Sequence, residues 1–168
     1  MPSGVSIVIP TWNGLELLRQ FLPSVIAATR QYTQDANVPT EILIVDDGST
    51  DATCEWLVEI GFNERSQEDG RQSPEGKRHE VASVDQCWPE SDVGPHAIAF
   101  RLLRNDSNRG FGETCNHGFK AAAFPLVFLL NNDVEVSIDA IAPLVEHFAD
   151  DSVFAAHCRV FEFDSGIE

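Results

Sequence analysis

Three apolar runs of this chain each stop at a cluster of polar side chains of the kind that binds nucleotides or metal ions. Residues 7–9 lead into Pro10-Thr11-Trp12-Asn13, residues 42–45 into Asp46-Asp47, and residues 127–130 into Asn131-Asn132-Asp133. Such runs are typical of strands buried on both faces, which belong to parallel sheets covered by helices. Because open α/β sheets bind ligands at the carboxyl ends of their strands, the clusters predict one binding site at one sheet edge.

The last cluster has the residue types that a phosphate-bound metal ion requires. Asp133 is the only acid directly after its predicted strand, and two amides, Asn131 and Asn132, precede it. Mg²⁺ and similar hard cations bind through one or two carboxylates together with substrate phosphates. Asn and Asp are also ordinary turn residues, so the cluster alone fits either a metal site or a turn.

Two adjacent acids, Asp46 and Asp47, follow the second predicted strand. A carboxylate at this position can accept hydrogen bonds from a base imide or a ribose hydroxyl. An ordinary helix-capping turn would explain the residues that follow, but not both acids. Trp12 is similarly open to two interpretations, an aromatic face for a nucleobase or a hydrophobic staple.

A polar, glycine-rich segment, Asn108-Arg109-Gly110-Phe111-Gly112, precedes another predicted helix. Cys115 stands where a dinucleotide fingerprint would have its third glycine, which argues against a nicotinamide enzyme. Arg109 lies near the expected helix start, where it can pair with a phosphate.

The composition restricts the partners of this 168-residue chain. Its net charge is −16, from 27 acidic and 11 basic residues, which argues against nucleic acid and anionic membrane surfaces. An acidic protein holds a phosphate best through a metal ion and backbone amides. The four cysteines form no CxxC pair and predict free thiols in a cytoplasmic protein, and the five histidines have no ligand spacing. No apolar run approaches the roughly 18–20 residues of a membrane span.

Hydrophobic periodicity predicts a single α/β domain over residues 1–168, with a mostly parallel sheet flanked by helices. Strands are expected over residues 5–10, 41–46, 98–103, 126–130 and 153–161. The first expected helix is capped by Asn13 and broken at Pro23, and the second covers residues 51–60. The third has Phe111, Cys115, Phe119 and Ala122 on its inner face, and the fourth is capped by Ser137. Residues 63–96 lack periodicity and predict a polar insertion loop that the fold does not need.

Together these motifs resemble the amino-terminal half of a family 2 glycosyltransferase with the GT-A fold. The resemblance rests on residues 5–13, 44–51, 108–118 and 128–135, in the order and spacing of the family. It implies a Rossmann-like half that binds a nucleotide-diphosphate sugar with Mg²⁺ or Mn²⁺. The Asn-Asn-Asp form is similar to a branch with rhamnosyl- and other deoxyhexose transferases, which favours a UDP- or dTDP-sugar.

The resemblance also implies a role for each position. Pro10, Thr11 and Trp12 would line the base pocket with Asn13, and Asp47 would hydrogen-bond the base with Asp46 beside it. Arg109 would lie near the phosphates or the base. Asn131-Asn132-Asp133 stands where the family has its Asp-x-Asp motif, so Asp133 would bind the metal and Asn131 or Asn132 would contact the ribose or the sugar.

The catalytic base of the family lies beyond this motif, and the chain ends at Glu168, so we expect a truncated chain without the base. The full-length enzyme, membrane-associated or not, would transfer the sugar with inversion to an acceptor hydroxyl of a glycan or a lipid-linked saccharide. Two alternatives are a non-catalytic nucleotide- or partner-binding module and a sugar-phosphate nucleotidyltransferase. The latter needs a basic, glycine-rich loop after the first strand, and residues 10–15 contain no basic residue.

Overall fold

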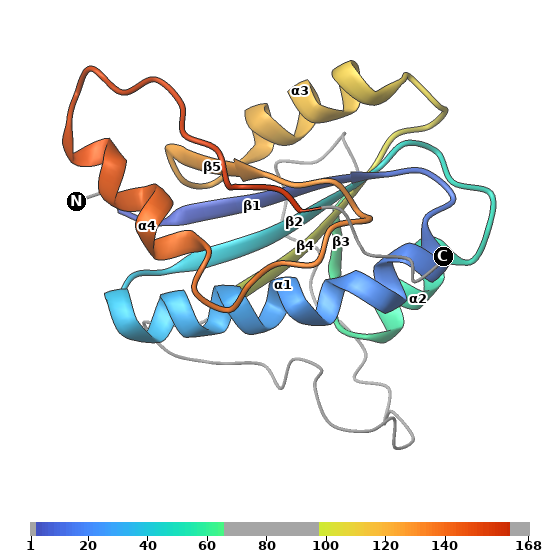
Figure 1. Cartoon of the computed structure of the whole chain (residues 1–168). Helices are drawn as coiled ribbons and strands as arrows, with labels where there is room; N and C mark the ends of the chain where they lie inside the picture. Colours follow the sequence, from blue (N-terminus) through green and yellow to red (C-terminus); the bar gives the residue numbers. More distant parts are fainter. Residues whose placement is uncertain (1–2, 66–97, 162–168) are drawn as a thin grey trace, which may run out of the picture.

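A computed structural model describes residues 3–65 and 98–161 of the chain. Strands and helices alternate along it: β1 (Val5–Thr11), α1 (Leu15–Ala36), β2 (Thr40–Asp46), α2 (Thr53–Glu59), β3 (Asn63–Arg65), β4 (Ile98–Arg104), α3 (Phe111–Ala121), β5 (Leu126–Leu129), α4 (Ile141–Glu146) and the 3₁₀ turn His147–Ala149. The strands form one sheet in the order β3-β4-β2-β1-β5, and each pairing is parallel (Figure 1). The predicted α/β class is confirmed.

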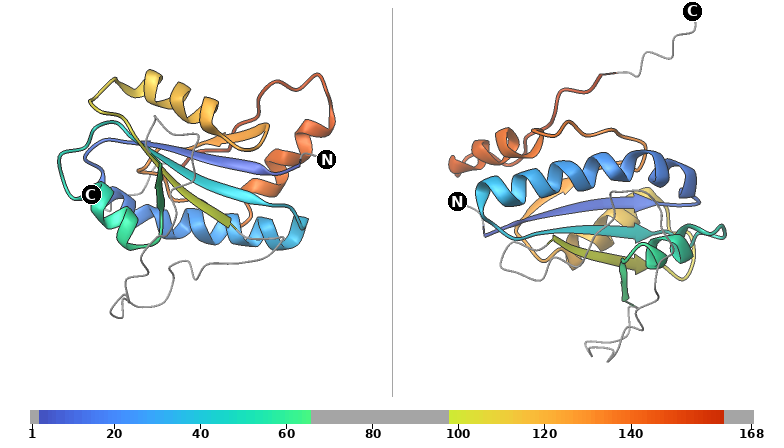
Figure 2. Two further views of the ribbon diagram at one scale, coloured as in Figure 1. Left: turned by 180° about the vertical axis from the view of Figure 1, so that it is seen from behind. Right: turned by 90° about the horizontal axis from the view of Figure 1, so that it is seen from below.

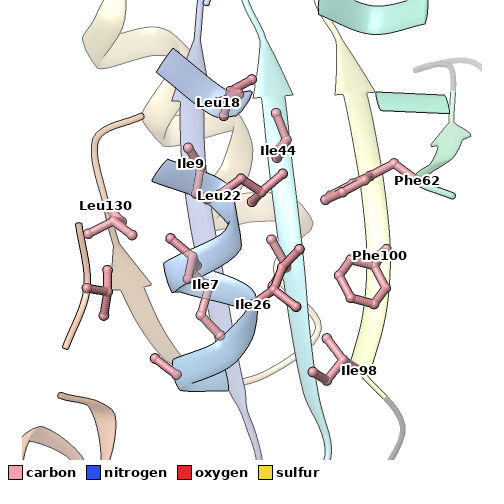
Figure 3. Packing of buried hydrophobic residues seen from close by; sticks show 14 of the residues in the cluster. Ile7, Ile9, Leu18, Leu22, Ile26, Ile44, Phe62, Ile98, Phe100 and Leu130 are labelled. Atoms are coloured by element: carbon pink, nitrogen blue, oxygen red, sulfur yellow. The ribbon is translucent and has the colours of Figure 1, made fainter. Parts of the chain in front are cut away.

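Helices cover both faces of the sheet, with α1, α2 and α4 on one side and α3 on the other (Figures 1 and 2). The larger core lies on the α1 side, where Leu22 and Ile26 of α1 pack toward Ile7, Ile9 and Ile44 (Figure 3). The α3 side has a smaller apolar cluster of Val8, Leu43, Val45 and Leu103. Residues of β1 and β2 therefore contribute to both cores, as alternation along a strand dictates.

Parallel pairing places the loops after β1, β2, β4 and β5 at one edge of the sheet, where α1 and α3 also begin (Figure 1). Pro10 has no N–H to extend the ladder toward β5. The last pairing between these strands joins Val8 and Leu129, and the last hydrogen bond runs from Leu130 N to Val8 O. Beyond that point β1 and β5 are free to separate, which leaves room between their polar ends.

Two strand predictions are wrong. The strand ending at Leu130 was expected to be buried on both faces, but β5 is half-buried, with Leu129 39% exposed. Among the described strands β5 pairs only with β1, so one of its edges has no neighbour. Residues 153–161 form no strand, and Phe154 is 97% exposed. Alternating apolar residues predict a strand only where a neighbouring strand is available to pair with it.

Predictions for the helices α1 and α3 are also wrong. The helix α1 runs through Pro23 without a break, because the packing of its apolar face outweighs one lost hydrogen bond. Asn13 does not cap this helix; Gly14 precedes it without a side-chain cap. On α3 the inner face consists of Thr114, Cys115 and Gly118, whereas Phe111 and Phe119 are exposed. Gly118 permits this packing, since a Cβ there would lie 2.4 Å from Val8 Cγ1.

The predicted insertion loop begins later than expected. Its first three residues form β3, which pairs with β4, and residues 66–96 lie outside the described residues. Ser137 does not cap α4, which begins at Ile141. The thiols of Cys54, Cys115 and Cys158 are free as predicted, and Cys87 lies outside the described residues. In the described ranges, none of the helices combines the length and apolarity needed to cross a membrane.

Candidate functional site

A cavity of about 370 Å³ lies at the carboxyl edge of the sheet. All three strand-end clusters contribute to its wall: Pro10, Thr11 and Trp12 after β1, Asp47 after β2, and Asn131, Asn132 and Asp133 after β5. Five further residues complete it: Leu17 of α1, and Asn108, Gly110, Phe111 and Thr114 at the start of α3. The structure therefore brings together in one cavity most of the site residues predicted from the sequence.

Asn13 is not among the residues that line the cavity. Its φ of 48° turns the backbone so that the side chain faces the loop after β2. There Asn13 Oδ1 accepts hydrogen bonds from the backbone N–H groups of Thr50 at 2.8 Å and Asp51 at 3.3 Å. Asn13 N in turn donates to Ser49 Oγ at 2.7 Å. The role of Asn13 is to join two of the loops that carry the cavity.

Asp46 also lies away from the cavity. It is fully buried, and its Oδ2 accepts a hydrogen bond from Ser49 N at 3.0 Å, which closes the turn after β2. Another neighbour is the thiol of Cys54 on α2. Burial and, next to it, the adjacent Asp46 carboxylate raise the pKa of that thiol to about 12. Asp46 therefore shapes the turn that presents Asp47.

Arg109 contributes its backbone rather than its side chain to the site. Its guanidinium lies 3.5 Å from the carboxylate of Glu113, one turn along α3, and does not line the cavity. Both groups are exposed, so this ion pair adds little stability. That the Arg109 side chain lies near the phosphates or the base stays a prediction.

Asp47 lies in the cavity wall, is largely buried, and holds the loop between β4 and α3. Its Oδ1 accepts from Asn105 Nδ2 at 2.8 Å and from Arg109 N at 2.9 Å, and its Oδ2 accepts from Gly110 N at 2.9 Å. Burial raises the pKa of Asp47, but these hydrogen bonds and Thr114 together lower it below the ordinary value. Asp47 is thus an ionised carboxylate that acts only as a hydrogen-bond acceptor.

Gly48 lets this loop approach the turn after β2. Its φ is +74°, and a Cβ there would lie 2.7 to 2.9 Å from backbone atoms of Ser107 and Asn108. Gly48→Ala should therefore lower the free energy of unfolding by about 1–3 kcal/mol, because both the dihedral and the contact are unfavourable. Chemical denaturation of the native protein and of Gly48→Ala measures this difference in the free energy of unfolding.

The matched control is Gly112→Ala in the first turn of α3. No atom lies within 4 Å of a Cβ at Gly112, and its backbone is helical. This change should stabilise the protein by up to about 1 kcal/mol. Equal stability of the two variants would contradict the close approach at Gly48.

Thr11, Gly14 and Asn132 join the ends of β1 and β5 at the base of the cavity. Asn132 Nδ2 donates to Thr11 Oγ1 at 2.9 Å. A Cβ at Gly14 would lie 2.2 Å from Thr11 Oγ1 and 2.5 Å from Asn132 Nδ2, so only glycine fits beside this bond. Because the amide of Asn132 is engaged, Asn131 is the more exposed of the two amides for a ligand.

The cavity suits an anionic ligand that binds together with a metal cation. The N-termini of α1 and α3 both reach it through Leu17, Gly110 and Phe111, and helix N-termini attract anions. Asp133 is an exposed residue of the same cavity, and the described residues contain no group of three or more His, Cys, Asp or Glu side chains arranged to hold a metal. One carboxylate beside two amides fits an ion that is also coordinated by ligand phosphates.

Two aromatic side chains are exposed in the cavity. Trp12 is 55% exposed and Phe111 is 61% exposed, although each is large and apolar. Exposed aromatic faces of this kind are suited to stacking against a planar or sugar ring. Sequence reasoning assigned Phe111 to the inner face of α3. The signal that it missed is the glycine on each side of Phe111, which leaves this first turn open to the cavity.

Comparison with known proteins agrees with this geometry. The family model described as Glycosyl transferase family 2 matches residues 6–71 and 71–167, which is nearly the whole chain. The chain belongs to family 2 of the glycosyltransferases.

One curated relative of this family 2 chain is the undecaprenyl-phosphate 4-deoxy-4-formamido-L-arabinose transferase of Pectobacterium carotovorum. It is 30% identical over 145 residues, which cover 86% of this chain and 33% of the relative. The chain thus spans about a third of the length of this relative.

Two solved structures share the fold. The mannosyltransferase PcManGT from Pyrobaculum calidifontis, in complex with GDP-Man and Mn²⁺, has a TM-score of 0.60 and 20% identity, over 90% of this chain and 34% of the other. S. aureus TarS 1-349 in complex with UDP-GlcNAc has a TM-score of 0.51 and 16% identity, over 87% of this chain and 30% of the other. The fold is therefore that of the GT-A glycosyltransferases, as the sequence predicted.

Proposed function

We propose that this family 2 chain binds a nucleotide-diphosphate sugar in the strand-end cavity, with Mg²⁺ or Mn²⁺ held between Asp133 and the diphosphate. The observation that carries the proposal is the convergence of Trp12, Asp47 and Asp133, from three separate loops, on one cavity. The ligands bound in the two related structures, GDP-Man with Mn²⁺ and UDP-GlcNAc, support it.

Different residues of the cavity bind different parts of the donor. Pro10, Thr11 and Trp12 hold the base, and we assign the Asp47 carboxylate as the acceptor for an N–H of the base. The N-termini of α1 and α3 face the diphosphate, and Asn131 contacts the ribose or the sugar. The metal ion supplies stabilisation of the negative charge that develops on the diphosphate leaving group.

For the reaction we infer transfer with inversion to a lipid-linked acceptor, and we assign none of the described residues as the catalytic base. The curated relatives are named undecaprenyl-phosphate 4-deoxy-4-formamido-L-arabinose transferases, which supports a lipid-linked acceptor. Their name supports a formamido-arabinose sugar and not specifically the rhamnosyl branch. The preference for UDP or dTDP stays a prediction. The cytoplasmic location stays a prediction too.

Calorimetry tests the donor site directly. We expect UDP or dTDP to bind more tightly with Mn²⁺ or Mg²⁺ than without, because the ion links the diphosphate to Asp133. GDP tests the preference for the base, and CMP, which has one phosphate, tests the need for a diphosphate. An affinity that is the same with and without metal for every nucleotide would contradict the metal site.

A non-catalytic nucleotide-binding module is the second candidate, because no described residue is assigned as the catalytic base. A transfer assay with a nucleotide sugar and a lipid-phosphate acceptor separates the two functions. Nucleotide binding without sugar transfer would favour the binding module for this chain. The nucleotidyltransferase alternative lacks support, since the loop after β1 contains no basic residue between Pro10 and Leu15.

A further inference from the structure

A row of hydrogen bonds runs from the surface of α3 to the wall of the cavity. His117 Nδ1 lies 2.9 Å from Asn105 Oδ1, and Asn105 Nδ2 donates to Asp47 Oδ1 at 2.8 Å. Asp47 then accepts from the backbone N–H groups of Arg109 and Gly110. Neither Asn105 nor His117 lines the cavity. Asn105 is buried at 3% exposure, so this row lies inside the protein over most of its length.

The direction of every bond in the row follows from the charge of Asp47. An ionised carboxylate only accepts hydrogen bonds, so the group of Asn105 that faces Asp47 is its NH₂. The carbonyl oxygen of Asn105 must then face His117, and His117 Nδ1 must carry the proton. His117 is thereby held in the Nδ1–H tautomer, with Nε2 unprotonated in the neutral ring.

We propose that His117 and Asn105 are positioning residues for the donor nucleotide, acting through Asp47 on the loop formed by residues 105–110. His117 fixes the amide of Asn105, Asn105 fixes the carboxylate of Asp47, and Asp47 fixes the backbone at Arg109 and Gly110. That backbone carries Asn108 and Gly110 into the cavity wall. Residues one layer behind the cavity thus set its shape.

The row does not act as a pH switch. Burial lowers the pKa of His117, and the charges of Arg109 and Lys120 lower it further. Protonation at lower pH adds a proton at Nε2 and leaves the Nδ1–H bond to Asn105 unchanged. The bond therefore exists in both charge states, and the geometry of the loop stays constant as His117 titrates.

Amide hydrogen exchange in the nucleotide-free protein tests the row without relying on the proposed function. His117→Leu should speed exchange of the Arg109 amide about tenfold or more, since Asp47 loses its fixed orientation. Arg109 is the cleaner reporter, because Gly110 N also donates to Asn108 Oδ1 at 3.1 Å. His117→Gln keeps a side-chain N–H donor and should restore much of the protection. His147→Leu, on an exposed 3₁₀ turn, is the matched control and should change nothing.

Nucleotide affinity gives the second measurement, and it rests on the proposed function. His117→Leu should weaken UDP or dTDP binding about tenfold, with and without metal alike, and His117→Gln should bind more tightly than His117→Leu. If the native protein binds no nucleotide, the proposed function fails while the exchange result still decides on the row. Unchanged Arg109 exchange in a folded His117→Leu variant would overturn the positioning role.

The tautomer provides a signature that a purely structural histidine would not show. Nitrogen-15 NMR of the native protein above the pKa of His117 should show a protonated Nδ1 and an unprotonated Nε2. This is the less common tautomer in water, so the spectrum distinguishes a fixed ring from a free one. A protonated Nε2 with an unprotonated Nδ1 would overturn the assigned direction of the bonds.

Discussion

Glu41→Ala is expected to lower the free energy of unfolding by about 3–5 kcal/mol, because it leaves a charge unpaired inside the protein. Glu41 is 1% exposed, and its Oε2 lies 2.6 Å from the guanidinium of Arg101. Its Oε1 accepts hydrogen bonds from Ser6 Oγ and Ala123 N. The one carboxylate therefore joins β1, β2, β4 and the end of α3.

Denaturant unfolding of three variants measures this effect. The double variant Glu41→Leu with Arg101→Met removes both charges and should be far closer to the native stability than Glu41→Ala, because neither charge stays buried alone. Glu16→Ala breaks an exposed pair with Arg19 and should cost less than about 1 kcal/mol. If Glu41→Ala costs no more than Glu16→Ala, the buried network contributes nothing to stability.

Asp133→Asn should remove the metal-dependent part of nucleotide affinity and leave the fold intact. The amide is nearly isosteric and Asp133 is exposed, so packing does not change. What disappears is the negative charge that a hard cation requires, and the neighbouring amides of Asn131 and Asn132 cannot replace it. In titrations with UDP or dTDP, the variant should have about the same affinity with Mn²⁺ as without it. That affinity should be at least about tenfold weaker than the affinity of the native protein with Mn²⁺.

Two further variants separate the charge of Asp133 from other effects. Asp139→Asn removes an exposed acid outside the cavity and should bind nucleotide as the native protein does. Asp47→Asn should weaken binding whether or not metal is present, because an amide NH₂ would face the N–H groups of the loop. The same metal dependence for Asp47→Asn and Asp133→Asn would show that the two residues share one role. Unfolding of Asp133→Asn would show instead that Asp133 only closes a turn.

The alternation of apolar runs and helical periods was sufficient to predict the fold class from the sequence. Ile7–Ile9 and residues 42–45 are apolar at every position, and the structure buries both runs within the sheet. The errors come from tertiary context. Whether Pro23 breaks a helix depends on what packs beside it, and whether residues 153–161 form a strand depends on a partner that the sequence does not show.

The site was predicted from the sequence at the level of loops, less so at the level of single side chains. Strand ends bring Trp12, Asp47 and Asp133 together because parallel strands share a direction. Asn13 and Asp46 belong to the same loops but face other loops, since backbone turns such as the positive φ of Asn13 direct them away. Long-range hydrogen bonds, such as that between Asn105 and His117, leave no periodic signal in the sequence.

Two buried carboxylates hold the backbone at the two ends of the helix α3. Asp47 binds the backbone just before it, and Glu41 binds the backbone just after it, at Ala123. Between these anchors the inner face of Thr114, Cys115 and Gly118 packs against the sheet, and His117 bonds to Asn105. The outer surface of α3 can therefore be redesigned, for instance to carry a fluorescent label or an affinity tag, while the two carboxylates keep the cavity in place.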